Sequence, residues 1–274
     1  MADQLPEGDV DARRLFGTST RTLATAYLAL SIWLLGEVEY ARLVIARAAR
    51  EARASGHTVT IAQVYLFSTM FEGLRDDPAS TQLAAELAVE FAKAHGVVLY
   101  AAQSEIYACW ARGRLFDPES GVRELRVAQA AYFNQGNKIL APWFHGMLAE
   151  LEALAGRADT ALASVEAGLT VSKETGEHWI DSLLFRRKAE ILLKCDPANP
   201  APAEEAFQTA ITVAEQQGSR SYGLRAALAL AKLYQSIARP ADAHAVLAPA
   251  LERFSPTPEM PEIAEAQALL ERLA

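Results

Sequence analysis

The sequence is poor in cysteine and in residues that break helices. Its 274 residues include 2 cysteines, 15 glycines and 12 prolines. Cys109 and Cys195 lie far apart and neither belongs to a CxxC pair, so we expect both to be reduced residues of helices or core. With aromatic residues at only 8%, this composition favours a helical protein over β-rich, collagen-like or disordered ones.

The chain also lacks a net positive charge and long apolar runs. Its formal net charge is −8, so bulk attraction to phosphate backbones is absent and direct nucleic-acid binding is not expected. The most apolar stretch, residues 23–35, is interrupted by Thr25 and Ser31 and fits a buried helix better than a membrane span. The start of the chain lacks a basic segment followed by an apolar one, which a secretory signal requires. These absences predict a soluble, cytoplasmic protein that does not bind membranes.

What the sequence does contain is a repeat with a period of about 40 residues. Each copy has a small residue, a large apolar residue four positions later, and a second small residue three positions after that. Glycines that follow these copies, or fill the gap between them, are spaced 40, 40, 40 and 42 residues apart, at Gly56, Gly96, Gly136, Gly176 and Gly218. The copies begin at Ala41, Gly121, Ala161, Ala203 and Ala243. Such a period indicates stacked units that cannot bury their apolar faces alone.

Each unit has the pattern of two helices joined by a short turn, so we expect an all-α, right-handed α-solenoid. The turns contain glycine or Asp-Pro pairs, which suit helix ends. A flexible segment is expected at residues 1–17 and a solvating cap helix at 260–274, with Glu262, Glu265 and Glu271 facing outward. The repeats are expected over 18–259, in six units at about 18–57, 58–97, 98–138, 139–178, 179–220 and 221–255.

These units resemble the tetratricopeptide repeat, which has a small residue midway along its first helix and an Ala-x3-aromatic/Leu-x2-Ala pattern on its second. The first, fifth and sixth units match best; in the fifth, Ala189-x2-Leu192 precedes Ala203. The period exceeds the usual one of about 34 residues. Arg112 and Glu152 also stand where the pattern has an apolar residue. The resemblance therefore implies extended, degenerate repeats.

A narrower resemblance covers nearly the whole chain. Its most specific stretch is AEQQGSRSYGLRAALALAKLY at residues 214–234, followed by AVLAP at 245–249. This is similar to the C-terminal helical part of bacterial signalling proteins in which a class III adenylate cyclase or DNA-binding domain precedes an AAA ATPase module. The resemblance implies a regulatory sensor or scaffold, cut from or related to a longer protein. Because the chain has no GxxxxGK[ST] loop and no cyclase domain, neither activity is expected of it.

The first helices of successive units should line the concave face of the solenoid, whose C-terminal half is charged. There Arg186, Arg225 and Lys232, with Trp143 as an anchor, could clamp an acidic peptide or a C-terminal carboxylate. In the alternative reading, Arg186 pairs with Glu190 one helical turn away and Arg225 merely solvates the face. The candidate groove residues are Gln63, Gln103, Trp143, Glu150, Arg186, Glu190, Arg225 and Lys232.

Two other patterns are interpreted as structural. Arg47, Arg50 and Arg53 form a basic stripe, which we assign to a solvated helix face because Glu51 dilutes it. The five histidines do not pair with other ligand types at metal-binding spacings, so no metal and no cofactor are expected.

The sequence thus predicts a non-catalytic module that binds a protein, a peptide or a small effector, with a homodimer left open. The alternative is a helical-toroid enzyme of the (α/α)6 type, whose two carboxylates would be Glu150 and Glu190. A repeat protein that reads RNA is disfavoured by the acidic charge and by the lack of a basic residue in every unit.

Overall fold

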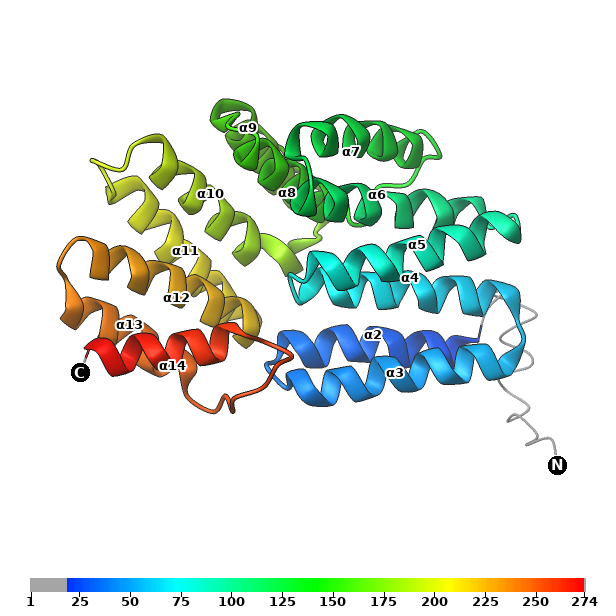
Figure 1. The fold of residues 1–274 in the computed structure, drawn as a ribbon, viewed down its shortest axis with the longest axis horizontal. Coiled ribbons are helices and arrows are strands. Elements are labelled where there is room, and N and C mark those ends of the chain that lie inside the picture. Colours follow the sequence, from blue (N-terminus) through cyan, green and yellow to red (C-terminus); the bar gives the residue numbers. More distant parts are fainter. Residues whose placement is uncertain (1–18, 274) are drawn as a thin grey trace. The chain divides into compact units, whose positions relative to one another are not determined.

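A computed structural model of the protein describes residues 19–273, and the regular structure in this range is helical (Figure 1). The range holds 13 α-helices and one short 3-10 helix, with no strand. Consecutive helices pair into hairpins, and the last helix follows the sixth hairpin. The expected all-helical solenoid is confirmed, whereas the expected flexible segment at 1–17 lies outside the described residues.

The hairpins follow one another in chain order. They are α2 (Thr20–Leu34) with α3 (Val38–Ser55), α4 (Thr58–Leu74) with α5 (Pro78–Ala94), α6 (Val98–Leu115) with α7 (Pro118–Phe133), α8 (Ala141–Leu154) with α9 (Ala158–Thr175), α10 (Asp181–Cys195) with α11 (Ala201–Gln217), and α12 (Arg220–Ser236) with α13 (Pro240–Leu251). The 3-10 helix η1 (His178–Ile180) leads into α10, and α14 (Glu262–Leu273) comes last.

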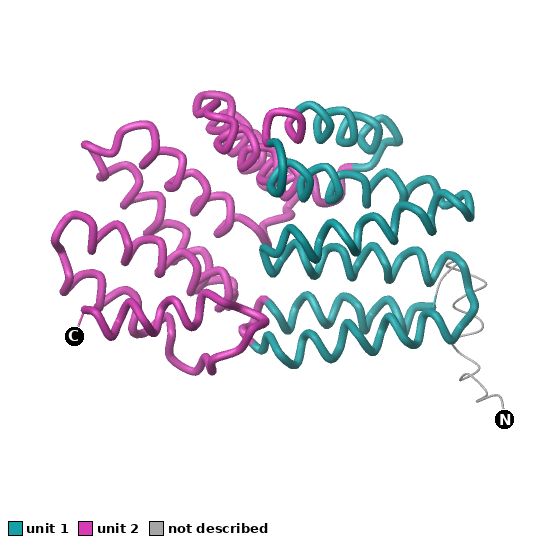
Figure 2. The backbone as a smooth tube through the Cα atoms, in the orientation of Figure 1, with its two compact units in different colours: residues 1–33, 37–117, 123–137 teal, residues 34–36, 118–122, 138–274 magenta. Residues whose placement is uncertain are grey.

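The chain divides into two compact units, which Figure 2 colours separately. Unit 1 comprises residues up to 33, 37–117 and 123–137, and in it α4 packs against α3, α5 and α6. Unit 2 comprises residues 34–36, 118–122 and 138–274. In unit 2, α8 packs against α9 and α10, α10 against α11 and α12, and α12 against α13 and α14. The first helices α4, α8 and α10 therefore each contact both their own hairpin partner and the first helix of the next hairpin.

The small–large–small pattern has a steric cause that is clearest on α9. Ala161 and Val165 are completely buried. A Cβ atom on Gly168 would lie 3.1 Å from the His145 Cβ and 3.2 Å from the Pro142 carbonyl oxygen, both on α8. It would also lie 3.3 Å from a methyl carbon of Leu184 on α10. The third position of the pattern must be small because α9 closely approaches both neighbouring helices there.

The helix ends follow the local chemistry of the turns. Gly218 ends α11 in the left-handed region, with a φ of 66°, where a side chain would be strained. At the start of α5, the Asp77 carboxylate accepts a hydrogen bond from the Ser80 N–H at 2.9 Å, and Pro78 occupies the first helical position. These turns set the hairpin lengths and hence the register in which the helices stack.

The two cysteines differ in their environment. Cys195 is exposed at the end of α10, whereas Cys109 is buried in α6. Burial raises the pKa of the Cys109 thiol to about 12. Cys109 is therefore a protonated core residue at neutral pH, as its sequence context predicts.

Candidate functional site

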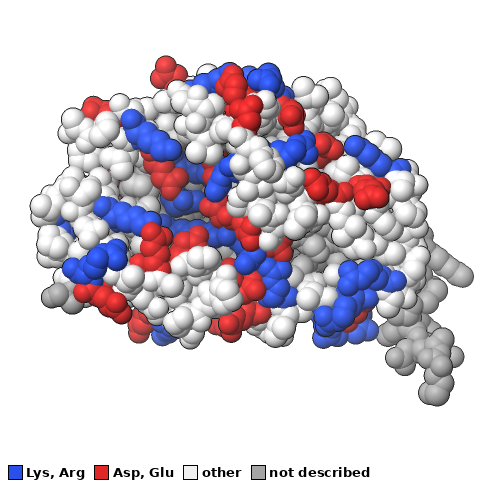
Figure 3. All heavy atoms as spheres, viewed as in Figure 1, with Lys and Arg blue, Asp and Glu red and all other residues white. Residues whose placement is uncertain are grey.

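A charged cleft with a volume of about 450 Å³ opens in unit 2, bordered by α10, α12 and α14. Figure 3 shows Lys and Arg side chains close to Asp and Glu side chains over these helices. Of the eight predicted groove residues, the cleft brings together Arg186, Glu190, Arg225 and Lys232. The other lining residues are Leu193, Lys194, Phe207, Leu228, Ala229, Leu233, Ser236, Glu262 and Glu265.

The predicted cations of the charged cleft are already paired within the chain. Arg186 Nη1 lies 2.5 Å from Glu190 Oε1, one turn along α10, as the alternative reading proposed. On α12, Lys232 Nζ lies 2.7 Å from Glu265 Oε1 of α14. A ligand anion would therefore approach cations whose charge is partly compensated, and it would have to share them or displace a carboxylate.

Arg225 corrects one expectation from the sequence, because it neither faces solvent nor stands free to clamp a ligand. Its side chain is 3% exposed, and its Nε donates to Glu262 Oε1 at 2.6 Å. The sequence predicts that Glu262 and Glu265 face outward from the cap helix, yet both are ion-paired with α12. Arg225 thus joins the last helix to the last hairpin.

Two polar groups of the charged cleft stay without a partner in the described part of the chain. Lys194 is exposed near the end of α10 and forms no ion pair there. Glu262 Oε2 is buried and has no hydrogen bond from any described residue. Sequence patterns missed Lys194 because it is a single exposed lysine. They missed the role of Glu262 because its partner lies 37 positions away.

Trp143 also corrects an expectation, because it is not an exposed anchor. It is 3% exposed at the start of α8, and its ring lies edge-on to Trp179 with 5.3 Å between the centroids. Alignment of equivalent positions in successive repeats places Trp143 on the first helix of its unit. It does not show that η1 covers the indole. We therefore assign Trp143 to the core of unit 2.

The two carboxylates of the enzyme alternative are held by different arginines. Glu150 Oε2 on α8 lies 2.6 Å from Arg187 Nη2 on α10, and Glu190 pairs with Arg186. Glu190 lines the charged cleft and Glu150 does not. The structure thus does not bring these two carboxylates to opposite walls of this cleft, which glycoside hydrolysis there would require.

The two predicted glutamines belong to unit 1. Gln63 lies on α4 and is half-buried, and Gln103 lies on α6 and is buried. Neither of them lines the charged cleft. The predicted groove residues are therefore divided between the two units, and the site is built here from those of unit 2.

A serine, a histidine and an aspartate meet where α9 ends and α10 begins. Ser172 Oγ lies 3.0 Å from His178 Nδ1 and 2.5 Å from Asp181 Oδ1, and Asp181 Oδ2 lies 2.9 Å from the same Nδ1. In a hydrolytic triad the serine and the aspartate contact opposite ring nitrogens. Because both contact Nδ1 here and Ser172 is 1% exposed, this cluster joins helix ends.

Three further observations bear on other kinds of site. Arg47 of the basic stripe pairs with Glu51 at 2.7 Å, one turn along α3, as expected of a solvated face. Within residues 19–273, no three His, Cys, Asp or Glu side chains are grouped so that they could hold a metal ion. No helix in that range is both long and apolar enough to cross a bilayer.

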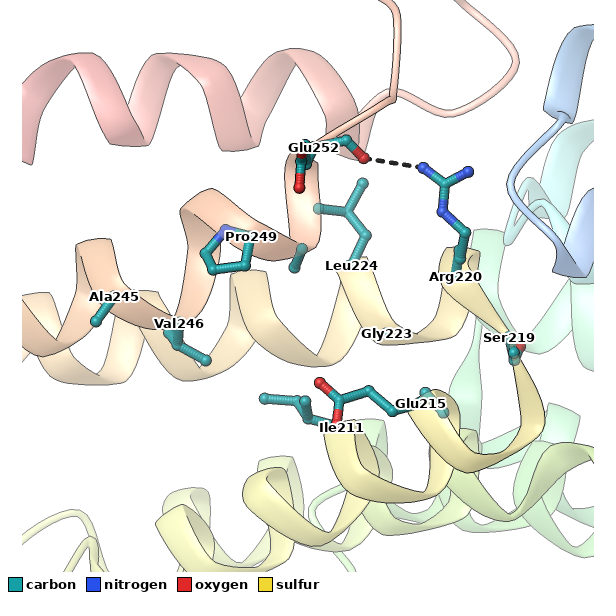
Figure 4. A pocket seen from close by; sticks show the side chains of 13 residues that line it. Ile211, Glu215, Ser219, Arg220, Gly223, Leu224, Ala245, Val246, Pro249 and Glu252 are labelled. Carbon is teal, nitrogen blue, oxygen red and sulfur yellow. Dashed lines mark hydrogen bonds between the residues drawn. The ribbon is translucent and has the colours of Figure 1, made fainter.

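A second cavity in unit 2, of about 430 Å³, lies between α11, α12 and α13 (Figure 4). Its walls are largely apolar, with Ile211, Leu224 and Val246 among them. The Arg220 guanidinium donates to the Glu252 backbone oxygen at 2.9 Å, as the dashed line in Figure 4 shows. This cavity contains none of the predicted groove residues, and its one basic side chain is engaged with the backbone. It is thus a poorer match to a charge clamp than the charged cleft.

Comparisons with known proteins find a distant relative. No family model matches the chain. An uncharacterized protein of Rhizobium meliloti (strain 1021) is similar, with 25% identity over 211 residues. The match covers 77% of this chain and 20% of the relative, so the chain spans about a fifth of the length of that protein. The resemblances to tetratricopeptide repeats and to bacterial signalling proteins stay predictions.

Proposed function

We propose that this chain is a non-catalytic interaction or effector-sensing module that binds its partner in the charged cleft of unit 2. The partner is a protein or peptide, or a small effector, that presents a carboxylate. One observation carries the proposal: four cations converge on one apolar-floored cleft and outnumber its carboxylates by one. The cations are Arg186, Lys194, Arg225 and Lys232, and the carboxylates are Glu190, Glu262 and Glu265.

The pairing pattern supports binding over catalysis. Each carboxylate of the charged cleft is held by an arginine or a lysine of the same chain. A general acid or base needs a group free to exchange a proton with a bound substrate. A ring of paired charges instead gives specificity, since a ligand with the wrong charge disturbs several pairs at once.

The helices that form the charged cleft also support a regulatory role. α14 contributes two of its charged residues, so an occupied cleft acts directly on the last described helix. The relative from Rhizobium meliloti is much longer than the matched region, which fits a helical region working within a larger protein. We propose that the chain is related to the C-terminal regulatory part of a bacterial cyclase, ATPase or transcriptional regulator.

The test is capture of partners by the full chain and by a variant with a neutralised cleft. In Lys194→Gln/Lys232→Gln, both changed side chains are exposed, so the fold should persist. The matched control is Lys138→Gln/Lys173→Gln, two exposed lysines of unit 2 outside the cleft. Quantitative mass spectrometry should find a partner enriched by the wild type and the control and lost by the cleft variant. Equal capture by all three chains would refute binding through this cleft.

A further inference from the structure

We infer that the second cavity of unit 2, between α11, α12 and α13, binds a small organic cation in which an apolar body carries one amino group. This inference goes beyond the proposed function, because the cavity shares no lining residue with the charged cleft. Three features of the cavity carry it: apolar walls with room for a small molecule, two carboxylates without ion-pair partners, and an arginine that is already engaged.

The walls of this cavity suit an apolar ligand. Ile211 lies on α11, Leu224 on α12 and Val246 on α13. Gly223 leaves the floor without a side chain, since a Cβ atom there would meet only the Ala214 Cβ among the described atoms within 4 Å, at 3.5 Å. The volume of about 430 Å³ falls within the range of about 300–1,000 Å³ that is usual for small-ligand pockets. A ring or a branched alkyl group therefore fits between the three helices.

Two glutamates set the charge of the ligand. Glu215 of α11 and Glu252 at the end of α13 both line the cavity, both are exposed, and neither forms an ion pair with a described residue. Figure 4 shows the Glu215 side chain extended from α11 toward α12, beside Ile211. Carboxylates next to apolar walls favour a ligand whose cationic group is attached to an apolar body, because one molecule then satisfies both parts of the site.

The basic side chain of the cavity does not neutralise these carboxylates by pairing with them. The Arg220 guanidinium donates to the backbone oxygen of Glu252 at 2.9 Å and lies over the Phe254 ring, 4.7 Å from its centroid. These contacts hold it where α12 begins and α13 ends. The lining therefore carries two negative charges and one positive charge, and a ligand with one positive charge balances it.

An equivalent cavity three hairpins earlier shows that this charge pattern is not a general consequence of the repeat. It has a volume of about 400 Å³ and lies in unit 1 between α5, α6 and α7, with Gly96 at the repeat position of Gly218. At the position of Glu215 it has Lys93, whose Nζ lies 3.5 Å from Glu105 Oε2. The same place in the repeat thus carries a paired cation in unit 1 and an unpaired anion in unit 2. An organic cation should distinguish the two cavities.

The experiment titrates the full chain with three fluorinated probes and follows their fluorine NMR signals. The probes share a fluorophenyl ring and differ in charge: 2-(4-fluorophenyl)ethylamine is cationic, 2-(4-fluorophenyl)ethanol is neutral and 3-(4-fluorophenyl)propionate is anionic. We expect the amine to bind with a Kd of about 1 mM or below. The alcohol should bind about tenfold more weakly, because it lacks the charge, and the propionate should not bind.

Two substitutions test the charge of the site. Glu215→Gln and Glu252→Gln should each weaken the amine about threefold and leave the alcohol unchanged, since an exposed charge contributes modestly. Glu252→Gln keeps the backbone oxygen to which Arg220 donates. Glu205→Gln changes an exposed glutamate of α11 outside the cavity, so this matched control should alter neither affinity.

A third substitution tests the apolar walls. Ala245 is exposed on α13, so Ala245→Phe should fold normally while its ring occupies part of the cavity. It should weaken the amine and the alcohol alike by about tenfold, because both need the same space. Ala241→Phe introduces the same ring at an exposed position of α13 outside the cavity and should leave both affinities unchanged.

Several results would overturn this inference. They are no saturable binding of the amine up to about 10 mM, equal affinities for the amine and the alcohol, or an amine affinity that both glutamine substitutions leave unchanged. Loss of amine binding in Glu265→Gln, with normal binding in Glu215→Gln, would place the amine in the charged cleft and also refute the inference. The proposed function is tested separately, because the Lys194→Gln/Lys232→Gln variant should bind the amine as the wild type does.

Discussion

Arg225 on α12 donates through Nε to the carboxylate of Glu262 on α14 at 2.6 Å, across 37 positions of the sequence. The arginine side chain is 3% exposed and that of the glutamate is 22% exposed, so the pair is largely shielded from water. After the sixth hairpin, α14 packs against both of its helices, α12 and α13. The ion pair fixes α14 in this position and at the same time builds one wall of the charged cleft.

Glu262→Ala should therefore destabilise unit 2 substantially. The change leaves a buried guanidinium without its carboxylate, which costs about 3 kcal/mol or more in comparable pairs. Glu265→Ala is the matched control, because Glu265 and Lys232 are both about half exposed, and such a pair contributes under about 1 kcal/mol. Urea unfolding of both variants measures the difference. Equal losses would mean that the burial of Arg225 does not govern the docking of α14.

Leu247→Ala should be far more damaging than Glu271→Ala. Leu247 on α13 is completely buried, and its truncation removes apolar contacts and leaves a cavity at a cost of about 2–5 kcal/mol. Glu271 on α14 is exposed, so its replacement should change stability by less than about 0.5 kcal/mol. Thermal or urea unfolding gives both values. Two variants that melt alike would show that the inward and outward faces of these helices are assigned wrongly.

Replacement by alanine should lower the stability of the protein at Gly168 and raise it at Gly223. At a helical position where a Cβ atom meets no close neighbour, Gly→Ala stabilises the helix by up to about 1 kcal/mol through its higher helix propensity. At Gly168 the new Cβ would lie 3.1–3.3 Å from three neighbouring atoms, and overpacking of this kind costs about 1–3 kcal/mol, so we expect a net loss. At Gly223 the nearest atom is 3.5 Å away, an ordinary contact, so we expect a gain. Stabilisation by both changes would refute the steric explanation of the repeat pattern.

The stability of unit 1 should depend on pH because of Asp77. Burial opposes ionisation of its carboxyl, but two hydrogen bonds from Ser80 and the Arg75 guanidinium outweigh it and lower the pKa below the ordinary 3.8. The pKa of Asp77 is lower in the folded chain than in the unfolded chain. Its ionised carboxylate therefore contributes fully to the free energy of unfolding above pH 3.8, and this contribution is lost as the pH falls through the folded pKa.

The variant Asp77→Ala measures this contribution. At neutral pH it should be less stable by about 1 kcal/mol, the usual cost of losing an N-cap carboxylate. The difference from the wild type should shrink in unfolding experiments below pH 3.8. Asp159→Ala is a control, since Asp159 is exposed in the first turn of α9 and does not occupy the N-cap. A difference between wild type and Asp77→Ala that stays constant from neutral to acidic pH would contradict this role.

The fold was predictable from the sequence because its determinants are local and recur. Gly168 keeps α9 close to its neighbours, and Gly218 ends α11, so period and spacing alone indicate helical hairpins. The charged cleft was predictable only in part. Arg186 and Glu190 are one turn apart and their pairing follows from spacing, but the contact between Arg225 and Glu262 depends on where α14 docks.

The wrong prediction for Trp143 also has its cause in contacts that depend on how segments dock. Trp143 occupies the register position of a first-helix residue, yet η1 brings Trp179 against its ring. The short 3-10 segment has no counterpart in the repeat pattern, so the register gave no sign of it. The repeat pattern of the sequence thus predicts the helices that form the charged cleft. It does not predict which side chains pack against one another.

The most direct test of the account is hydrogen–deuterium exchange on the full chain with and without a captured partner. Binding through the charged cleft predicts slower exchange in the segments 186–194, 225–236 and 262–265, with the rest of unit 2 and unit 1 unchanged. The Lys194→Gln/Lys232→Gln variant should lose this protection. Slower exchange confined to α3, where Arg47 and Arg50 lie, with the cleft segments unchanged, would contradict the account.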